Sequence, residues 1–139
     1  MTETVRDVMT PHPVTLHASM PIRDAARTMR DLDIAEVLVR QDDGALGIVT
    51  DRDLVVLALA EGADPERATI GRFSRHELAT VDADDPIDVA IEVAQEQPFA
   101  RVPVLDGGSL AGVVALGDLT RRLDPSSIPA RWSIAGVDR

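Results

Sequence analysis

The chain has 139 residues, of which 14 are basic and 24 acidic, with a formal net charge of -10 and neither cysteine nor tyrosine. Every basic residue is arginine; the absence of lysine excludes P-loop and Schiff-base chemistry, and the absence of cysteine excludes a thiol nucleophile. The acidic balance disfavours nucleic acids and anionic membrane surfaces as partners, because both are bound through basic side chains.

The N-terminal segment, Met1 to Asp7, is polar and acidic, whereas a secretory signal is cationic and then apolar. No apolar run approaches the roughly 20 residues that span a membrane. We therefore expect a soluble, cytoplasmic protein whose length suits one domain of ordinary size.

The first group of predicted elements occupies residues 14–61. Pro21 suits the first position of a helix, and apolar residues then recur at helical spacing as far as Leu32. Two β-rich runs separated by a turn follow, and Asp51 is the expected N-cap of the next helix. In order, we predict an extended piece at 14–16, a helix from Pro21, strands at 36–40 and 45–50, and a helix at 52–61.

The same order of elements returns 65 residues later, without a gap. The aligned pairs include Thr15 and Thr80, Pro21 and Pro86, Gly47 and Gly112, and Asp53 and Asp118. Asp85 is the expected N-cap of the first helix in this second copy. The predicted elements are an extended piece at 79–81, a helix from Pro86, strands at 101–105 and 110–115, and a helix at 118–123.

The gapless register indicates that the chain is two copies of one β-α-β-β-α unit, in the α/β class. In chain order we predict a first repeat with its leader at 1–61, a linker at 62–69, a second repeat at 70–123 and an irregular tail at 124–139. Trp132 in that tail is a candidate anchor.

The segment from Gly47 to Leu54 carries the most chemical information, because a strand there runs into the start of a helix. The N–H groups of a first helical turn lack partners within the helix and suit a phosphate. Thr50 adds a hydroxyl donor, and Asp53 offers acceptor oxygens for the hydroxyls of a ribose. The alternative is purely structural: Asp51 caps the helix and Asp53 complements its dipole.

The duplicated unit resembles a tandem pair of CBS domains, named after cystathionine beta-synthase, of the stand-alone bacterial type. The resemblance covers Val5 to about Leu123 and rests on four motifs: Val5-Arg-Asp-Val-Met-Thr-Pro, Gly47-Ile-Val-Thr-Asp-Arg-Asp-Leu, Phe99-Ala-Arg-Val-Pro-Val and Gly112-Val-Val-Ala-Leu-Gly-Asp-Leu. It implies a pseudo-two-fold CBS-pair module with two clefts, binding of AMP, ATP or S-adenosylmethionine, and a disk-like homodimer.

The resemblance also implies roles for individual residues. Asp53 and Asp118 match the acid that binds ribose, Thr50 matches the hydroxyl residue at the phosphate, and Arg101 occupies a basic position that often pairs with phosphate. Thr15 and Thr80 match residues that face the base or phosphate. The candidate ligand-binding set is Thr15, Ala35, Thr50, Arg52, Asp53, Thr80, Arg101 and Asp118.

Each copy also departs from the family pattern. Copy two has Ala115 at the hydroxyl position and Gly117 at the helix start, whereas copy one has Glu36 at the basic position and Leu38 in place of a proline. If one ligand draws on both copies, one site survives; if each cleft is self-contained, neither is complete. We expect one functional cleft between the repeats, centred on Thr50 and Asp53.

Other candidate groups carry weaker signals. Among the arginines, only Arg52 and Arg101 fall where the pattern lets an anionic ligand meet them. The aspartates between 82 and 88 suit helix capping better than a cation site. The three histidines, at 12, 17 and 76, lack a metal-ligand spacing, so we expect no metal site.

These features predict a non-enzymatic, ligand-sensing module that binds an adenine nucleotide and requires no cofactor. No catalytic residues are expected, since no motif brings the remaining candidate side chains together. The output would pass through a protein partner or through the homodimer itself. The alternative is a ligand-independent, stress-associated interaction module with degenerate nucleotide clefts.

Overall fold

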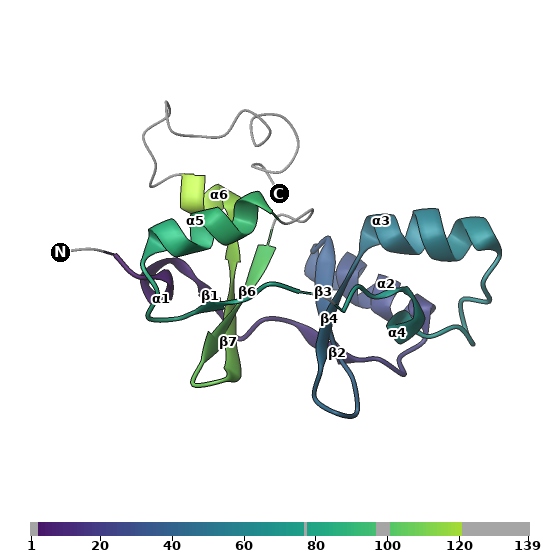
Figure 1. Ribbon diagram of the computed structural model, residues 1–139. Coiled ribbons are helices and arrows are strands. Elements are labelled where there is room, and N and C mark those ends of the chain that lie inside the picture. The colour runs from purple at the N-terminus through teal and green to yellow at the C-terminus, as the bar shows by residue number, and fades with distance from the viewer. Residues whose placement is uncertain (1–2, 77, 97–100, 121–139) are drawn as a thin grey trace. The chain divides into compact units, whose positions relative to one another are not determined.

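A computed structural model describes residues 3–76, 78–96 and 101–120 of the chain, and Figure 1 shows its course. The chain divides into two compact units. We call residues 14–78 the first-repeat unit, and residues 1–13 together with 79–139 the second-repeat unit. The predicted tail at 124–139, with Trp132, and the last residues of the predicted helix at 118–123 lie outside the described residues.

The first-repeat unit is built on a three-stranded sheet in the order β2-β3-β4. Strand β2 (Thr15–His17) runs parallel to β3 (Glu36–Arg40), and β3 is antiparallel to β4 (Leu46–Thr50). Helix α2 (Ile22–Leu32) connects the parallel pair. The predicted strand, helix and strand-turn-strand of the first repeat are therefore confirmed.

A longer helical segment follows β4 without a loop. Helix α3 (Asp51–Asp53) continues directly into η1 (Leu54–Leu59), which has π-helical hydrogen bonding, and the helical conformation ends at residue 61. The short helix α4 (Ile70–Phe73) then packs into the same unit. The prediction of a helix at 52–61 is confirmed to within one residue, but its geometry is wider than that of an α-helix.

The second-repeat unit contains a four-stranded sheet in the order β1-β7-β6-β5. Strands β5 and β6 are parallel, whereas the β6-β7 and β1-β7 pairs are antiparallel. Its elements are α1 (Val5–Val8), β1 (Thr10–Pro11), β5 (Val81–Asp82), α5 (Ile87–Gln95), β6 (Arg101–Asp106), β7 (Ser109–Ala115) and α6 (Leu116–Thr120). The second copy thus repeats the β-α-β-β-α order of the first.

Both predicted aspartate N-caps are wrong. Thr50, and not Asp51, caps the helix after β4, because its hydroxyl oxygen accepts from the Asp53 N–H. Asp85 turns back to accept from the Asp82 N–H at 2.9 Å, so that Pro86 is the extended residue before α5. A proline suits that position since it has no N–H to satisfy.

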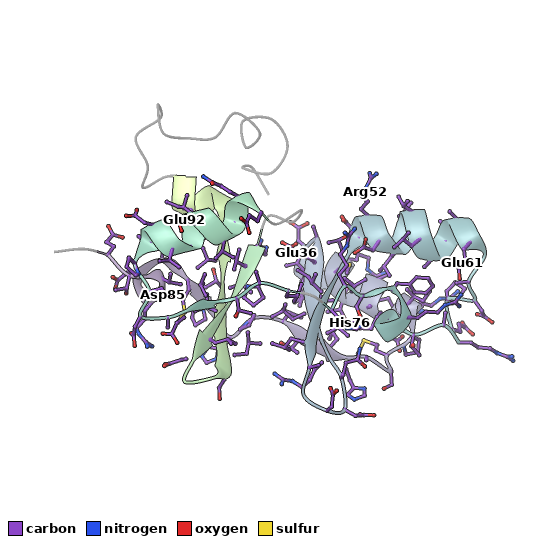
Figure 2. The ribbon with its side chains drawn as sticks, in the orientation of Figure 1. Glu36, Arg52, Glu61, His76, Asp85 and Glu92 are labelled. Carbon is purple, nitrogen blue, oxygen red and sulfur yellow. The ribbon has the colours of Figure 1, made fainter. Side chains whose placement is uncertain are left out.

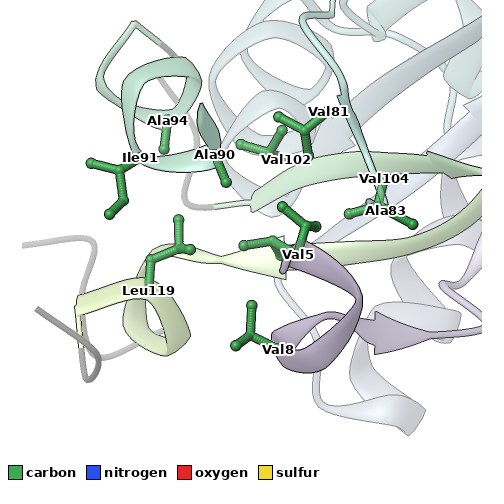
Figure 3. Close-up of a cluster of buried hydrophobic side chains, with 11 residues drawn as sticks. Val5, Val8, Val81, Ala83, Ala90, Ile91, Ala94, Val102, Val104 and Leu119 are labelled. Carbon is green, nitrogen blue, oxygen red and sulfur yellow. The ribbon is translucent and has the colours of Figure 1, made fainter. Parts of the chain in front are cut away.

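Each of the two units has its own hydrophobic core. The second-repeat core consists mainly of valine and alanine with Ile91 and Leu119, and Figure 3 shows it between α1, α5, α6 and the sheet. The first-repeat core adds Phe73 and Met29 to similar small aliphatic side chains. Small β-branched residues fit the short distance between a sheet and the helices that cover it.

The first short helix of each predicted repeat, α1 or α4, packs into the core of the other repeat. Val5 and Val8 of α1 enter the second-repeat core, whereas Ile70 and Phe73 of α4 enter the first-repeat core. These pairs are related by the same shift of 65 residues. Each compact unit therefore consists of one repeat without its own short first helix, together with the short helix and following extended segment of the other repeat.

A glycine in the second strand of each β-hairpin, β4 or β7, permits this packing. A Cβ on Gly112 would lie 2.5 Å from the Thr10 carbonyl oxygen, and one on Gly47 would lie 2.8 Å from the Arg75 carbonyl oxygen. Both distances are shorter than any real contact, so only glycine lets the crossing backbone approach. The two motif glycines thus have a structural reason for their position.

Candidate functional site

The junction between β4 and the following helix forms a reciprocal capping box. The Asp53 N–H donates to Thr50 Oγ1 at 3.0 Å, and the Thr50 N–H donates to Asp53 Oδ2 at 3.0 Å. This arrangement satisfies two backbone donors at once and fixes both side chains relative to the strand end. The two residues predicted to hold phosphate and ribose are therefore adjacent, and they are bonded to each other.

Asp53 is a charged side chain at a buried position, with 3% of its surface exposed. Its second oxygen, Oδ1, accepts from Arg75 Nη2 at 3.2 Å, which completes an ion pair between the helix and the extended segment after α4. A buried carboxylate needs such a partner, because desolvation otherwise disfavours its charge. The carboxylate thus has one contact on each oxygen and further lone pairs on both.

Arg75 contacts the candidate acid Asp53, although the sequence prediction expected only Arg52 and Arg101 near an anionic ligand. The backbone of Arg75 forms two hydrogen bonds with Ile48 in β4, each 2.9 Å long. That pairing places its side chain over the start of the helix. The equivalent residue 65 positions earlier is Thr10, which pairs with β7 in the same way.

Two further candidates, Ala35 and Thr15, lie at the same end of the first-repeat sheet, together with Glu36. Glu36 pairs with Thr50 across β3 and β4, and the Ala35 carbonyl oxygen accepts from the Asp51 N–H at 2.8 Å. Thr15 is the first residue of the neighbouring parallel strand β2. The structure therefore brings Thr15, Ala35, Thr50 and Asp53 to the same end of the strands. The acidic residue Glu36 lies at this end as well.

Arg52 does not join this group. Its side chain is exposed, and Figure 2 shows it extending from the first helical turn away from the sheet. Asp53, one residue later, is turned inwards and buried, because consecutive helical residues point about 100° apart. Of the two arginines on this side, Arg75 and not Arg52 contacts the candidate acid.

The remaining candidates, Arg101, Thr80 and Asp118, lie at the equivalent end of the strands in the second-repeat unit. Arg101 begins β6 opposite Ala115 at the end of β7, and Thr80 immediately precedes β5. Asp118 lies in α6 and is half-buried. Ala115 occupies the position of Thr50 without a hydroxyl, so a side-chain capping box like that of the first repeat is chemically impossible there.

The histidine region contains one further polar cluster. His17 Nε2 lies 2.7 Å from Asp42 Oδ1, and His17 Nδ1 lies 2.8 Å from Ser19 Oγ. The Ser19 N–H also donates to Nδ1 at 3.0 Å, and all three side chains are exposed. The cluster closes a turn between β2 and the β3-β4 hairpin, and it lacks the buried, oriented base of a catalytic triad.

Metal ligation and membrane insertion were both considered for residues 3–76, 78–96 and 101–120, and these residues contain neither a metal-binding cluster nor a membrane-spanning helix. Within these ranges no group of three or more histidine, cysteine or acidic side chains is arranged to hold a metal ion. In the same part of the chain, no helix is both long and apolar enough to cross a lipid bilayer.

The duplicated architecture and its motifs match a known family. The CBS domain family matches residues 5–59 and 70–125, one match for each repeat. The chain is a CBS-pair protein. The resemblance drawn from the sequence motifs and the two-repeat α/β fold are both confirmed.

The relatives of this CBS-pair protein include bacterial proteins of similar length. Hypoxic response protein 1 of Mycobacterium tuberculosis is 36% identical over 126 residues, which cover 90% of this chain and 88% of the relative. The CBS domain-containing protein YhcV of Bacillus subtilis is 28% identical over 115 residues, covering 83% of this chain and 81% of that protein.

Solved structures agree with the fold. The crystal structure of Hypoxic Response Protein I with two coordinated zinc ions superposes with a TM-score of 0.77 at 35% identity, covering 88% of this chain and all of that chain. A CBS-domain containing protein from Agrobacterium tumefaciens gives a TM-score of 0.74 at 28% identity, covering 87% and 93% of the two chains. CBS-pair proteins are generally regulatory, and the match names no catalytic family.

Proposed function

We propose that this CBS-pair protein is a non-enzymatic, cytoplasmic sensor that binds an adenine nucleotide at the Thr50-Asp53 junction. The observation that carries the proposal is the buried carboxylate of Asp53, held by the capping box beside the half-buried end of the first-repeat sheet. Carboxylate oxygens with remaining lone pairs suit the two neighbouring hydroxyls of a ribose.

Charge at the junction also supports an anionic ligand. Arg75 brings a guanidinium to Asp53, and arginine binds phosphate through parallel donors. Glu36 on the neighbouring strand opposes a phosphate by like charge. The proposed site therefore has one favourable side, at Arg75 and Thr50, and one unfavourable side, at Glu36.

A sensor needs two states that its ligand distinguishes. A nucleotide shifts the protein towards one state only by its difference in affinity for the two. Output then passes to a protein partner or to the oligomer.

Differential scanning fluorimetry with AMP and ATP tests the proposal. We expect millimolar AMP or ATP to raise the Tm of the wild-type protein, and Asp53→Ala to abolish that shift. Asp24→Ala, which removes an exposed acid on α2, is the matched control and should keep the shift. A wild-type Tm that ignores AMP, ATP and S-adenosylmethionine would contradict the proposal.

A ligand-independent interaction module is the second candidate. Glu36, Leu38 and Ala115 depart from the nucleotide-binding pattern, and Asp53 is already satisfied by Thr50 and Arg75. Hypoxic response protein 1 of Mycobacterium tuberculosis, a relative of this chain, is named for a stress response. This candidate predicts a stability that does not respond to nucleotides and a protein partner recovered by cross-linking in cells.

The proposal includes a homodimer formed through the helix at 51–61. Its outward side chains Val55, Val56, Leu57 and Leu59 are 57%, 47%, 45% and 65% exposed, whereas Ala58 is buried. No charged residue lies between Asp53 and Glu61. Two chains of net charge -10 repel each other, so an uncharged apolar surface is where a second copy can approach.

Sedimentation velocity tests the dimer. We expect the wild-type protein to sediment as a dimer at micromolar concentration, and the double variant Val55→Glu, Leu59→Glu to sediment as a monomer, because four buried carboxylates would face one another in the dimer. Ser109→Glu, at an exposed position in the other repeat, is the control for added charge. A dimer that survives the double variant would place the interface elsewhere.

A further inference from the structure

The turn between β2 and α2 is closed by the ring of His17 in one particular protonation state. The Ser19 N–H donates to His17 Nδ1 at 3.0 Å, so that nitrogen must carry a lone pair. On the other side of the ring, Nε2 lies 2.7 Å from Asp42 Oδ1, and an ionised carboxylate can only accept. Both contacts therefore require the neutral ring with its proton on Nε2.

Protonation of His17 breaks one of these contacts and keeps the other. An imidazolium carries a proton on both nitrogens, so Nε2 still donates to Asp42, whereas Nδ1 no longer accepts from the Ser19 N–H. The Ser19 hydroxyl, 2.8 Å from Nδ1, can reverse its role and accept, but a backbone N–H cannot. The Met20 N–H keeps its bond to the His17 carbonyl oxygen, 3.0 Å long, in either state. The proton therefore loosens the turn without unfolding it.

The loosened turn is the support on which the short helix α4 rests. The Gly71 N–H donates to the Ala18 carbonyl oxygen and the Ile70 N–H to the Met20 carbonyl oxygen, each at 2.9 Å. A Cβ on Gly71 would lie 2.8 Å from the Cβ of Ala18, which shows how closely α4 approaches the turn. A turn that opens at Ser19 therefore weakens the docking of α4.

The second repeat builds the same turn with an acceptor that a proton does not remove near neutral pH. Asp82 stands 65 residues after His17, and its Oδ1 accepts from the Asp84 N–H at 2.9 Å. Helix α1 rests on this turn as α4 does on the other, with the Arg6 N–H donating to the Ala83 carbonyl oxygen at 2.8 Å. Aspartate stays ionised between about pH 5 and 8, where histidine changes its charge. Of the two turns, the first is therefore the one that responds.

Charges around His17 act on its proton in both directions. The charged or titratable groups on the neighbouring elements are Arg23 of α2, Arg40 of β3, Asp42 and Asp43 of the next turn, Arg72 of α4 and His76. Both helix arginines are held in ion pairs, with the glutamates at 61 and 66. The carboxylate of Asp42 favours the imidazolium, whereas Arg40, the register partner of His17, disfavours it. The His17 side chain is exposed, so solvent protons reach it.

We propose that His17 is a pH-sensitive switch that controls how firmly α4 is docked in the first-repeat unit. The neutral ring closes the turn under α4, and the protonated ring stays with Asp42 and releases the Ser19 N–H. The segment that crosses β4 follows α4 directly, and Ser74 Oγ donates to the Gly71 carbonyl oxygen at 3.1 Å, so its anchor weakens as well. This regulation goes beyond the proposed function and requires no nucleotide.

Amide hydrogen exchange of the full chain, followed by NMR, tests the switch. Protection factors are compared at about pH 7.5 and about pH 5.5, on either side of histidine titration. We expect the protection of the Gly71 N–H to fall about threefold to tenfold at the lower pH, which is the effect of one lost hydrogen bond. The Arg6 N–H, its equivalent on α1, should change by less than about twofold because its turn has a carboxylate acceptor.

Two variants separate His17 from other effects of acid. His17→Asn supplies an amide oxygen that accepts from the Ser19 N–H at any pH, so the difference in Gly71 protection should disappear. His76→Gln is the matched control in the same unit and should keep the difference. The present contact of His76 Nδ1 is with the Gln41 amide at 3.5 Å, and an amide can offer its oxygen instead when the ring is protonated.

The ring nitrogens of His17 give a second, direct measurement on the wild-type protein. Nitrogen-15 NMR at about pH 7.5 should find the proton on Nε2 and none on Nδ1. A proton on Nδ1 at that pH would overturn the proposal, as would an equal loss of protection at Gly71 and Arg6. A pH response that persists in His17→Asn would overturn it too, and none of these results depends on whether the protein binds a nucleotide.

Discussion

The two strand-to-helix junctions, at residues 50–53 and 115–118, occupy the same position in the repeat but offer different chemistry. The first has a hydroxyl, a buried carboxylate and an arginine from the segment after α4. The second has Ala115 at the hydroxyl position, and Thr10 where the first has Arg75. Because the strands, glycines and crossing segments are shared, the difference separates what the fold requires from what a ligand site requires.

Several motif residues that occur in both units have a role in packing. Gly47 and Gly112 admit a crossing backbone in both units, although only one junction has the polar groups of a candidate site. Val5 and Ile70, which match at the same shift, are both fully buried. Such residues would remain in a CBS pair that had lost its ligand.

Substitution of the two glycines has the largest expected effect and tests the shared part. Gly112→Ala should lower the free energy of unfolding by about 3 kcal/mol and Gly47→Ala by about 2 kcal/mol, because each Cβ would collide with a backbone carbonyl oxygen. Urea denaturation followed by circular dichroism measures both. Ser109→Ala, at an exposed position of β7, is the control.

A neutral result at one glycine and a large loss at the other would break the equivalence of the two units. In that case the crossing segment would pack tightly in only one of them.

Substitutions at the capping position should change the free energy of unfolding by less, and they test the difference between the two junctions. Thr50→Ala removes the hydroxyl that accepts from the Asp53 N–H and should cost about 1 kcal/mol of unfolding free energy. The reciprocal change, Ala115→Ser, should add about 0.5 kcal/mol by supplying a cap to the second junction. Both are measured by chemical denaturation.

A loss on Ala115→Ser would show that the second junction has no room or geometry for a cap. A neutral Thr50→Ala would mean that the capping box does not stabilise the first junction.

The sequence predicted the repeat, its order of elements and most of their bounds, because hydrophobic periodicity and the gapless shift are local signals. The capping residues were assigned incorrectly for a physical reason. Thr50 and Asp51 are both good N-caps, and only the pairing of Thr50 with Glu36 at the end of β4 decides between them. Asp85 does not cap α5, because its carboxylate accepts a hydrogen bond from the Asp82 N–H in the preceding turn.

The candidate site was predicted in part. Thr50 and Asp53 were found together from their spacing alone. The contact with Arg75 was missed because it is 22 residues from Asp53, and the contact depends on the pairing of Arg75 with Ile48 in β4. The alignment of Arg75 with Thr10 was available in the sequence, but it does not show that each segment crosses the sheet of its compact unit.

The most direct test of the central claim is the stoichiometry of AMP binding by isothermal titration calorimetry. We expect one AMP per chain, no binding by Asp53→Ala, and unchanged binding by Asp118→Ala, because the first junction has a hydroxyl and an arginine that the second lacks. Two nucleotides per chain, or one that is lost on Asp118→Ala and kept on Asp53→Ala, would contradict the assignment of the site to the first repeat.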